Sequence, residues 1–378
     1  MVVKKNLYKY SIHAFVLLVI HLVYFNLSWS LSNENDLIAI LNKFETKINS
    51  THIEKNNDYL FVNTGYDNSL TDVETEYGTP GNTVITNREM LAVLFHSLIQ
   101  NGNRHKYILC DILFDIPSAN DTILEKQINK IKNFISPSSV YNTKEQLRSK
   151  LIFNINNAPA EYITYKGILT KMHLKENFTG KKSLPLEMYE DISGKKVKDN
   201  GLFLHYKGNY IPRSIFPRYY VTKPKMKDRV LQLSTLTEML STGDDRFYNE
   251  NIKDKILIIG NLNEDIHNTS LRIMPGSLVL FNTYLSLYDG YHLIHWTWFV
   301  FILICFGFLI HFSIFREEKH SVQKNKMIGE FLKQLASLAF LTIALSLISS
   351  IIFKVHITVL PVIIYIESVK FIKKYVLK

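Results

Sequence analysis

The sequence predicts an α/β extracytoplasmic domain with a three-layer, mostly parallel sheet, joined to α-helical transmembrane segments. Three observations lead to this fold class. Strand-like and helix-like segments alternate between residues 59 and 288. One long apolar run precedes them and three follow. Basic residues gather beside the apolar runs and not in the middle of the 378-residue chain.

The net charge of +10 belongs almost entirely to the two ends of the chain. Residues 1–30 carry +3 and residues 293–378 carry +6, which leaves +1 for residues 31–292. A domain that binds nucleic acid would carry the excess in its folded body, so we expect no nucleic-acid partner. The hydrophobic content of 47% excludes a disordered chain. Two cysteines exclude a disulfide-stapled scaffold.

Each apolar run is predicted to be a transmembrane helix, with the lipid bilayer as partner. About 20 apolar residues cross the hydrocarbon core of a bilayer. A cleaved signal peptide is the alternative for the first run, but its length and the poor cleavage site at residues 28–30 favour an uncleaved anchor. The runs are Ile12–Trp29 within an anchor segment 1–30, then residues 293–315, 334–353 and 355–372.

The basic flanks predict the orientation, because lysine and arginine concentrate on the cytoplasmic side. This rule places the N-terminus, the loop 316–333 and the tail 373–378 inside the cell. Residues 31–292 then lie outside the cytoplasm. We therefore expect a multi-pass protein of the inner or plasma membrane with a periplasmic or extracellular domain.

The first half of this outer domain is predicted to alternate strand, helix, strand, helix, strand. Tyr59–Asn63 is a short apolar strand, and apolar residues at helical spacing predict a helix that Thr86 or Asn87 caps and that runs to Gln100. A near-continuous apolar run is typical of a buried parallel strand and predicts one at Tyr107–Phe114. A helix capped by Asp121 and running to Phe134 follows, and then a strand near Leu151–Ile155.

The second half begins with a less regular insertion. Residues 159–227 are rich in Lys, Tyr, Gly and Pro, with a hairpin expected near Leu202–Tyr206. Regular elements then return, which favours one α/β domain. They are a helix Arg229–Ser241 capped by Asp228, a strand Lys255–Gly260, and a helix Ser277–Tyr288 that ends before Gly290.

Polar side chains follow two of the predicted strands. Asp111, Asp115 and Asp121 come at the end of one strand, and Asp265 and His267 follow another. If the two strands are neighbours, these groups converge on a cation or a polar ligand, because open α/β sheets bind ligands at the carboxyl ends of strands. In the alternative, Asp121 is a helix cap and Asp115 a turn residue. Arg88 either pairs with one of these acids or is an ordinary first-turn residue.

Several short motifs occur in a defined order along the chain. In that order they resemble the CHASE2 family of extracytoplasmic sensory domains, over roughly residues 55–378. The motifs are Asp67–Leu70, Asn87–Glu89, Cys110–Asp115, Asn120–Asp121, Ile258–Gly260, Asp265–Thr269 and Pro275–Gly276, followed directly by apolar runs.

The resemblance implies a receptor-type domain that senses an unidentified ligand and transmits the signal through the membrane. CHASE2 proteins commonly carry a kinase or cyclase after the spans, whereas few residues follow the last apolar run here. We therefore expect a separate membrane or cytoplasmic signalling partner. The acidic pair frequent near the family's first strand is present only as Asp67, and the histidine frequent after Pro-Gly is absent. The candidate ligand-binding residues are Asp67, Arg88, Asp111, Asp115, Asp121, Asp265 and His267.

No catalytic signature accompanies these residues. The sequence has no nucleophile elbow, no phosphate-binding P-loop and no His-Glu-x-x-His zinc pair, and it indicates no particular metal or cofactor. Two other functions stay open: a membrane-bound hydrolase that uses a divalent metal at Asp111, Asp115, Asp265 and His267, and an envelope scaffold. In the spans we expect His13 and His21 to be packing residues rather than a proton path, and Glu367 to pair with Lys370.

Overall fold

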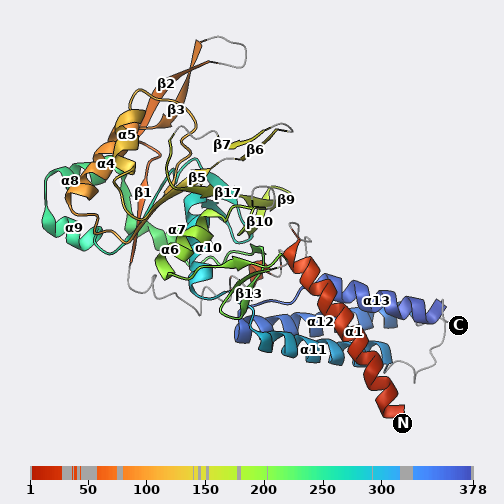
Figure 1. Ribbon diagram of the computed structural model, residues 1–378. Helices are drawn as coiled ribbons and strands as arrows, with labels where there is room; N and C mark the ends of the chain where they lie inside the picture. The colour runs from red at the N-terminus through yellow and green to blue at the C-terminus, as the bar shows by residue number, and fades with distance from the viewer. Residues whose placement is uncertain are drawn as a thin grey trace. The chain divides into compact units, whose positions relative to one another are not determined.

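The computed structural model divides into two compact units, which are described separately (Figure 1). The α/β unit comprises Asn42–Lys196 and Ile215–Asp289, and the helical unit comprises Met1–Leu41, Val197–Ser214 and Gly290–Lys378. The residues that the structure describes are 2–27, 36, 38–40, 43, 58–74, 80–138, 140–143, 146–149, 153–176, 180–201, 203–291, 293–315 and 327–375.

A six-stranded sheet forms the centre of the α/β unit. Its strand order is β15-β1-β16-β4-β5-β8, and every neighbouring pair is parallel. The prediction of an α/β fold with a mostly parallel sheet is therefore confirmed. The strands are β1 (Tyr59–Asn63), β4 (Tyr107–Asp111), β5 (Phe134–Ser138), β8 (Asn157–Pro159), β15 (Val230–Gln232) and β16 (Ile256–Gly260).

Helices cover both faces of this sheet (Figure 1). Val62, Cys110 and Ile259 point to one face, where they share a core with the first set of helices. Phe61 points to the other face, and its ring centroid lies 5.8 Å from that of Phe281. This double coverage explains why the central strands β1, β4 and β16 are apolar up to their last residues, which are Asn63, Asp111 and Gly260. The first set is α4 (Arg88–Gln100), α5 (Asp121–Ile128), α8 (Leu233–Ser241) and α9 (Asp245–Asn251), and the second is α6 (Leu184–Ser193) and α10 (Gly276–Tyr288).

Local signals placed several elements correctly. β1 has the predicted bounds, and the helix predicted to end at Gln100 is α4. Its cap is Asn87, whose side chain accepts a hydrogen bond from the main-chain nitrogen of Met90 at 3.1 Å. The predicted hairpin is also present, formed by β12 (Leu204–Tyr206) and β13 (Asn209–Ile211).

The helix predicted from Asp121 to Phe134 is too long. α5 ends at Ile128, and Phe134 opens strand β5. A turn intervenes, with Asn133 at a φ of 54°. Ile131 continues the helical spacing of apolar residues, but it lies in this turn and is buried there. The apolar spacing therefore extends beyond the end of the helix.

The strand predicted near Leu151–Ile155 is also wrong for the residues that the structure describes. Phe153 and Ile155 are buried in the core without strand structure, and the next strand of the sheet is β8. Residues 151 and 152 lie outside the described residues. The helix predicted at Arg229–Ser241 begins only at Leu233, because Val230–Gln232 pairs with β1. Asp228 therefore lies in a short 3-10 turn and does not cap this helix.

Smaller elements complete the described chain. They are strands β2 (Asn68–Glu74), β3 (Pro80–Thr86), β6 (Val140–Thr143), β7 (Gln146–Ser149), β9 (Tyr162–Tyr165), β10 (Ile168–His173), β11 (Lys198–Asp199), β14 (Ser214–Ile215), β17 (Ile266–Asn268) and β18 (Ile273–Pro275), with helix α7 (Lys223–Met226) and the 3-10 turn Lys227–Arg229.

Among the described residues of the helical unit, two helices are long and apolar enough to cross a membrane. These stretches are Trp296–Ser313 and Leu335–Phe353, which coincide with the two middle predicted spans. Tyr10–Tyr24, in the first predicted span, is a shorter apolar helix, and the last helix has only 17 residues. The elements are α1 (Val2–Asn26), α11 (Trp296–Ile310), a π-helical turn (His311–Phe315), α12 (Met327–Phe353) and α13 (Val359–Tyr375).

Polar side chains join α1 to the other helices of this unit. His21 Nδ1 lies 2.6 Å from Thr358 Oγ1, and His13 Nδ1 lies 2.8 Å from the Tyr365 hydroxyl. Leu17 of α1 belongs to the same buried core as residues of α11 and α13. The two histidines therefore act as packing residues between helices, as the sequence suggested. The predicted pair also forms, with Lys370 Nζ 3.0 Å from Glu367 Oε1.

Candidate functional site

The sheet order brings the candidate loops together. β16 lies between β1 and β4, with Gly260 opposite both Asn63 and Asp111. Parallel strands end at the same edge, so the segments that follow β1, β4 and β16 meet there. The chain enters α4 and α10 from this edge, which is the usual ligand-binding edge of an open α/β sheet.

Asp111, Asp265 and His267 gather at this edge, over the first turn of α10. His267 Nε2 lies 3.1 Å from Asp265 Oδ1. A Cβ atom on Gly276, the first residue of α10, would lie 3.1 Å from Asp111 Oδ2 and would overlap Asp265 Oδ2. Both carboxyl groups therefore occupy the space that a side chain at this position would fill.

This crowding explains the Pro-Gly motif. Gly276 donates its main-chain N–H to the carbonyl oxygen of Asp265 at 2.9 Å, which fixes the loop against the helix. Any side chain at position 276 would displace the carboxyl groups. Because the N-terminus of a helix carries partial positive charge, it also favours acids placed there.

The carboxyl groups of Asp111 and Asp265 interact electrostatically. Burial first, and then the Asp265 carboxylate, raise the pKa of Asp111 to about 8, while His267 acts in the opposite direction. The Oδ2 atom of Asp111 is fully buried and has no hydrogen-bond partner, and burying a charged carboxylate without a partner is costly. The raised pKa therefore favours the protonated form of Asp111 near neutral pH.

His267 complements this pair. Its hydrogen bond to Asp265, and then the charges of both acids, raise its pKa against the effect of burial. The imidazole centroid lies 5.0 Å from the ring centroid of Tyr162, whose own pKa burial raises far above the ordinary value. The site therefore offers a protonated acid, a carboxylate and a basic imidazole, which together can exchange a proton or hydrogen-bond a polar ligand.

Among the described residues, no group of three or more His, Cys, Asp or Glu side chains is arranged to hold a metal ion. Asp115, which the metal-hydrolase hypothesis requires, lies instead in the electrostatic environment of Arg88.

Arg88, Asp115 and Asp121 form a second group on the other face of the sheet. The Arg88 guanidinium lies 4.6 Å from the ring centroid of Phe114 and donates to the carbonyl oxygen of Ile116 at 3.4 Å. Its Nη1 atom is 4.0 Å from Asp121 Oδ1. Burial lowers the pKa of Arg88, and Asp121, Cys110 and Asp115 oppose that shift.

Two of the predicted residues have clear local bonds. Asp121 Oδ2 accepts a hydrogen bond from the Ser118 nitrogen at 2.7 Å and so stabilises the turn before α5. Asp67 is 8% exposed, and its Oδ2 accepts from the Ser234 nitrogen at 3.1 Å, in the first turn of α8. Asp67 thus supplies the cap that the sequence analysis assigned to Asp228.

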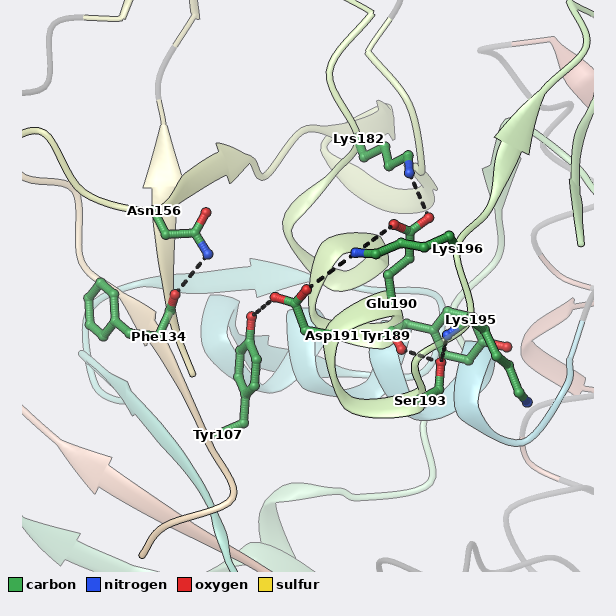
Figure 2. Close-up of polar contacts among 10 residues, drawn as sticks. All are labelled: Tyr107, Phe134, Asn156, Lys182, Tyr189, Glu190, Asp191, Ser193, Lys195 and Lys196. Atoms are coloured by element: carbon green, nitrogen blue, oxygen red, sulfur yellow. Dashed lines mark hydrogen bonds and ion pairs between the residues drawn. The ribbon is translucent and has the colours of Figure 1, made fainter. Parts of the chain in front are cut away.

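A further polar cluster lies on α6 and was not predicted (Figure 2). Glu190 is only 1% exposed, and its carboxylate lies 2.7 Å from Lys182 Nζ and 3.5 Å from Lys196 Nζ. The neighbouring Asp191 accepts a hydrogen bond from the Tyr107 hydroxyl at 2.8 Å. These contacts tie α6 to β4.

The helix itself has sequence signals that could have revealed it. Ser183 precedes Pro185 in the first turn, and Gly194 follows the last turn with a φ of 67°. Serine before a helix, proline in the first turn and glycine after the end are typical helix boundaries. The many lysine and glycine residues on either side of this segment make the helix hard to recognise in the sequence.

Comparison of the chain with protein-family models, with curated proteins and with solved structures finds no match. The resemblance to CHASE2 domains therefore rests on the ordered sequence motifs alone.

Proposed function

We propose that this chain is a membrane-anchored, CHASE2-like sensory protein. Its α/β unit lies outside the cytoplasm and binds a small polar ligand at the strand-end site. The apolar helices anchor it and transmit the signal to a separate membrane or cytoplasmic partner.

One observation carries the proposal. Asp111, Asp265 and His267 meet over the first turn of α10, and the chain leads from α10 through residues 289–295 into the apolar helix α11. A ligand that takes up or displaces the shared proton changes the charge at the start of α10. Because that charge interacts with the helix N-terminus, ligand binding changes the packing of the element that precedes the membrane helix.

The membrane location has separate support. In the part of the chain that the structure describes, two helices are long and apolar enough to cross a bilayer. The segments that would lie on the cytoplasmic side, residues 1–11, 316–333 and 373–378, carry most of the basic excess of the chain. The nearly neutral segment 31–292 belongs on the opposite side in this scheme.

A thermal-shift screen of the full chain in mild detergent tests the proposal. We expect at least one compound of a polar-metabolite library to raise the unfolding temperature of the wild type, and Asp265→Asn to abolish that shift. Asp254→Asn is the matched control, because Asp254 is an exposed acid in a left-handed turn that asparagine tolerates. A library without any stabilising compound, or a shift that Asp265→Asn leaves unchanged, contradicts the proposal.

A further inference from the structure

A small pocket opens beside the acid pair, between the ends of β4 and β16 and the start of α4. Its volume is about 220 Å³, and its lining includes Arg88, Asp111, Thr86, Ile112, Ile116 and Asn261. At about 30 Å³ for each water in the liquid, this space equals about seven waters. A space of that size accommodates a small metabolite.

Arg88 is the unusual side chain of this pocket. It is 2% exposed, yet its Nε and Nη1 atoms donate no hydrogen bond. Asp121 Oδ1, at 4.0 Å from Nη1, is too distant for one. A guanidinium keeps its charge in proteins, so buried donors without an acceptor are costly. A ligand carboxylate would supply the acceptor that Arg88 lacks.

The position of Arg88 strengthens this assignment. It is the first residue of α4, a 13-residue helix whose cap Asn87 accepts a hydrogen bond from Met90. The first N–H groups of a helix have no partner within it and favour an anion. The pocket also lies beside β16. Helix α10 follows β16 and covers one face of the sheet, whereas α4 and α5 follow the neighbouring strands β1 and β4 and cover the opposite face. Ligands bind at such topological switch points.

Asp111 gives the pocket a second polar group of different chemistry. Its protonated carboxyl can accept a hydrogen bond from a ligand amino group, and a cationic amino group would favour release of the proton that Asp111 holds. Ile112 and Ile116 add apolar surface between the polar ends. The pocket thus combines a cationic group, an acidic group and room for a few carbon atoms.

We propose that this pocket binds a small zwitterion, a short α-amino acid whose carboxylate faces Arg88 and whose amino group faces Asp111. This inference rests on the proposed function and names the chemical class of its ligand. The ligand bridges the two faces of the sheet edge, so its amino group acts on the acid pair over α10.

Titration calorimetry of the full chain in detergent tests the ligand class. Glycine, alanine and serine are the zwitterionic probes, propionate has only the carboxylate, and ethylamine has only the amino group. We expect saturable heat from at least one amino acid and none from propionate or ethylamine. Equal binding of propionate would overturn the zwitterion assignment.

Two variants test the residues. We expect Arg88→Lys to weaken amino-acid binding at least tenfold, because lysine cannot reproduce the guanidinium donors. Arg104→Lys is the control, since Arg104 also stacks on a ring, that of Tyr248, but is exposed and outside the pocket. Asp111→Asn, which preserves shape, should also weaken binding at least tenfold and carries the test if Arg88→Lys does not fold.

The outcomes separate this inference from the proposed function. If no amino acid binds but the metabolite screen yields a ligand that depends on Asp265, the zwitterion inference is wrong and the sensory function stands. Unchanged affinity in both pocket variants also overturns the inference. If neither experiment yields a ligand, both proposals are wrong.

Discussion

The protonated Asp111 gives the α/β unit a distinctive pH dependence. An aspartate in an unfolded chain titrates near pH 4, whereas burial and Asp265 raise the pKa of Asp111 to about 8 in the folded unit. The folded state therefore binds an extra proton between these values. The contribution of this proton to the free energy of unfolding is complete below about pH 4 and is lost as the pH rises through about 8. Between these values the free energy of unfolding falls by at most about 1.4 kcal/mol per pH unit.

We predict that Asp111→Asn removes most of this slope, because the amide does not titrate. The measurement is the urea-unfolding midpoint of the full chain between pH 5 and pH 9, followed by a near-ultraviolet signal. The pKa of His267 is also raised, so a weaker decline should remain in the variant. Identical pH profiles for wild type and variant would show that Asp111 is not protonated in the folded unit.

Gly276 provides a second test at the scale of single residues. We predict that Gly276→Ala destabilises the α/β unit by about 1 to 3 kcal/mol, because the new methyl group overlaps the Asp265 carboxylate. The raised pKa of His267 should fall towards its ordinary value, since the hydrogen bond to Asp265 is lost. Both effects are measurable, by urea unfolding and by NMR titration of the imidazole.

Gly307 is the matched control, because a Cβ atom there meets no atom within 4 Å. Gly307→Ala in helix α11 should be neutral or stabilising, as alanine has the higher helix propensity. A Gly276→Ala protein as stable as Gly307→Ala would contradict the crowded arrangement of the two carboxyl groups.

At the scale of elements, Glu190 of helix α6 pairs with two lysines that differ in distance and exposure. Lys182 is 27% exposed and contacts the buried Glu190 closely, whereas Lys196 is 68% exposed and more distant. We predict that Lys182→Ala costs about 1 to 3 kcal/mol of unfolding free energy, because it removes the closer charge from a buried carboxylate. Lys196→Ala should cost less than about 1 kcal/mol. Equal losses in urea unfolding would refute this ranking.

Helix α1 is bound into the helical unit, which makes its removal by a signal peptidase improbable. Leu17 lies in the shared core, and His13 and His21 bond to Tyr365 and Thr358. We predict that an epitope tag fused to residue 1 stays on the mature membrane protein. Immunoblotting of membrane fractions measures this, with a tag after residue 378 as the reference. A mature form that has lost only the N-terminal tag would contradict the prediction.

Elements with complete local signals could be predicted from the sequence, and elements that depend on distant partners could not. β1 and α4 are set by their own apolar pattern and by the Asn87 cap. β15 was mistaken for helix, because three residues become a strand only by pairing with β1. The length of α5 was overestimated, because Ile131 is buried from a turn and imitates helical spacing.

The same distinction applies to the candidate site. The loops after two apolar strands indicated Asp111, Asp265 and His267, and the structure brings these three together. Sequence could not separate them from Arg88 and Asp121, because strand order and alternation decide which face of the sheet each side chain occupies. The burial of Arg88 under Phe114 and the pocket beside it also depend on contacts distant in the chain.

At the scale of the whole molecule, charge and apolarity divide along the chain as a membrane-anchored sensor requires. The basic segments and the apolar helices belong to the helical unit. Apart from β11–β13, nearly all of the predicted outer segment, residues 31–292, belongs to the α/β unit. The proposed function depends on one placement above all, which is the position of the α/β unit outside the cytoplasm.

Cysteine labelling of intact cells with a membrane-impermeant maleimide measures that placement most directly. Both native cysteines are buried, which keeps the background low. Lys253 is exposed in the α/β unit, and Ser321 belongs to the basic segment 316–333 that the sequence predicts to be cytoplasmic. We predict that Lys253→Cys is labelled in intact cells and that Ser321→Cys is labelled only after the membrane is permeabilised. Labelling of Ser321→Cys in intact cells, with Lys253→Cys protected until permeabilisation, would contradict an extracytoplasmic sensor.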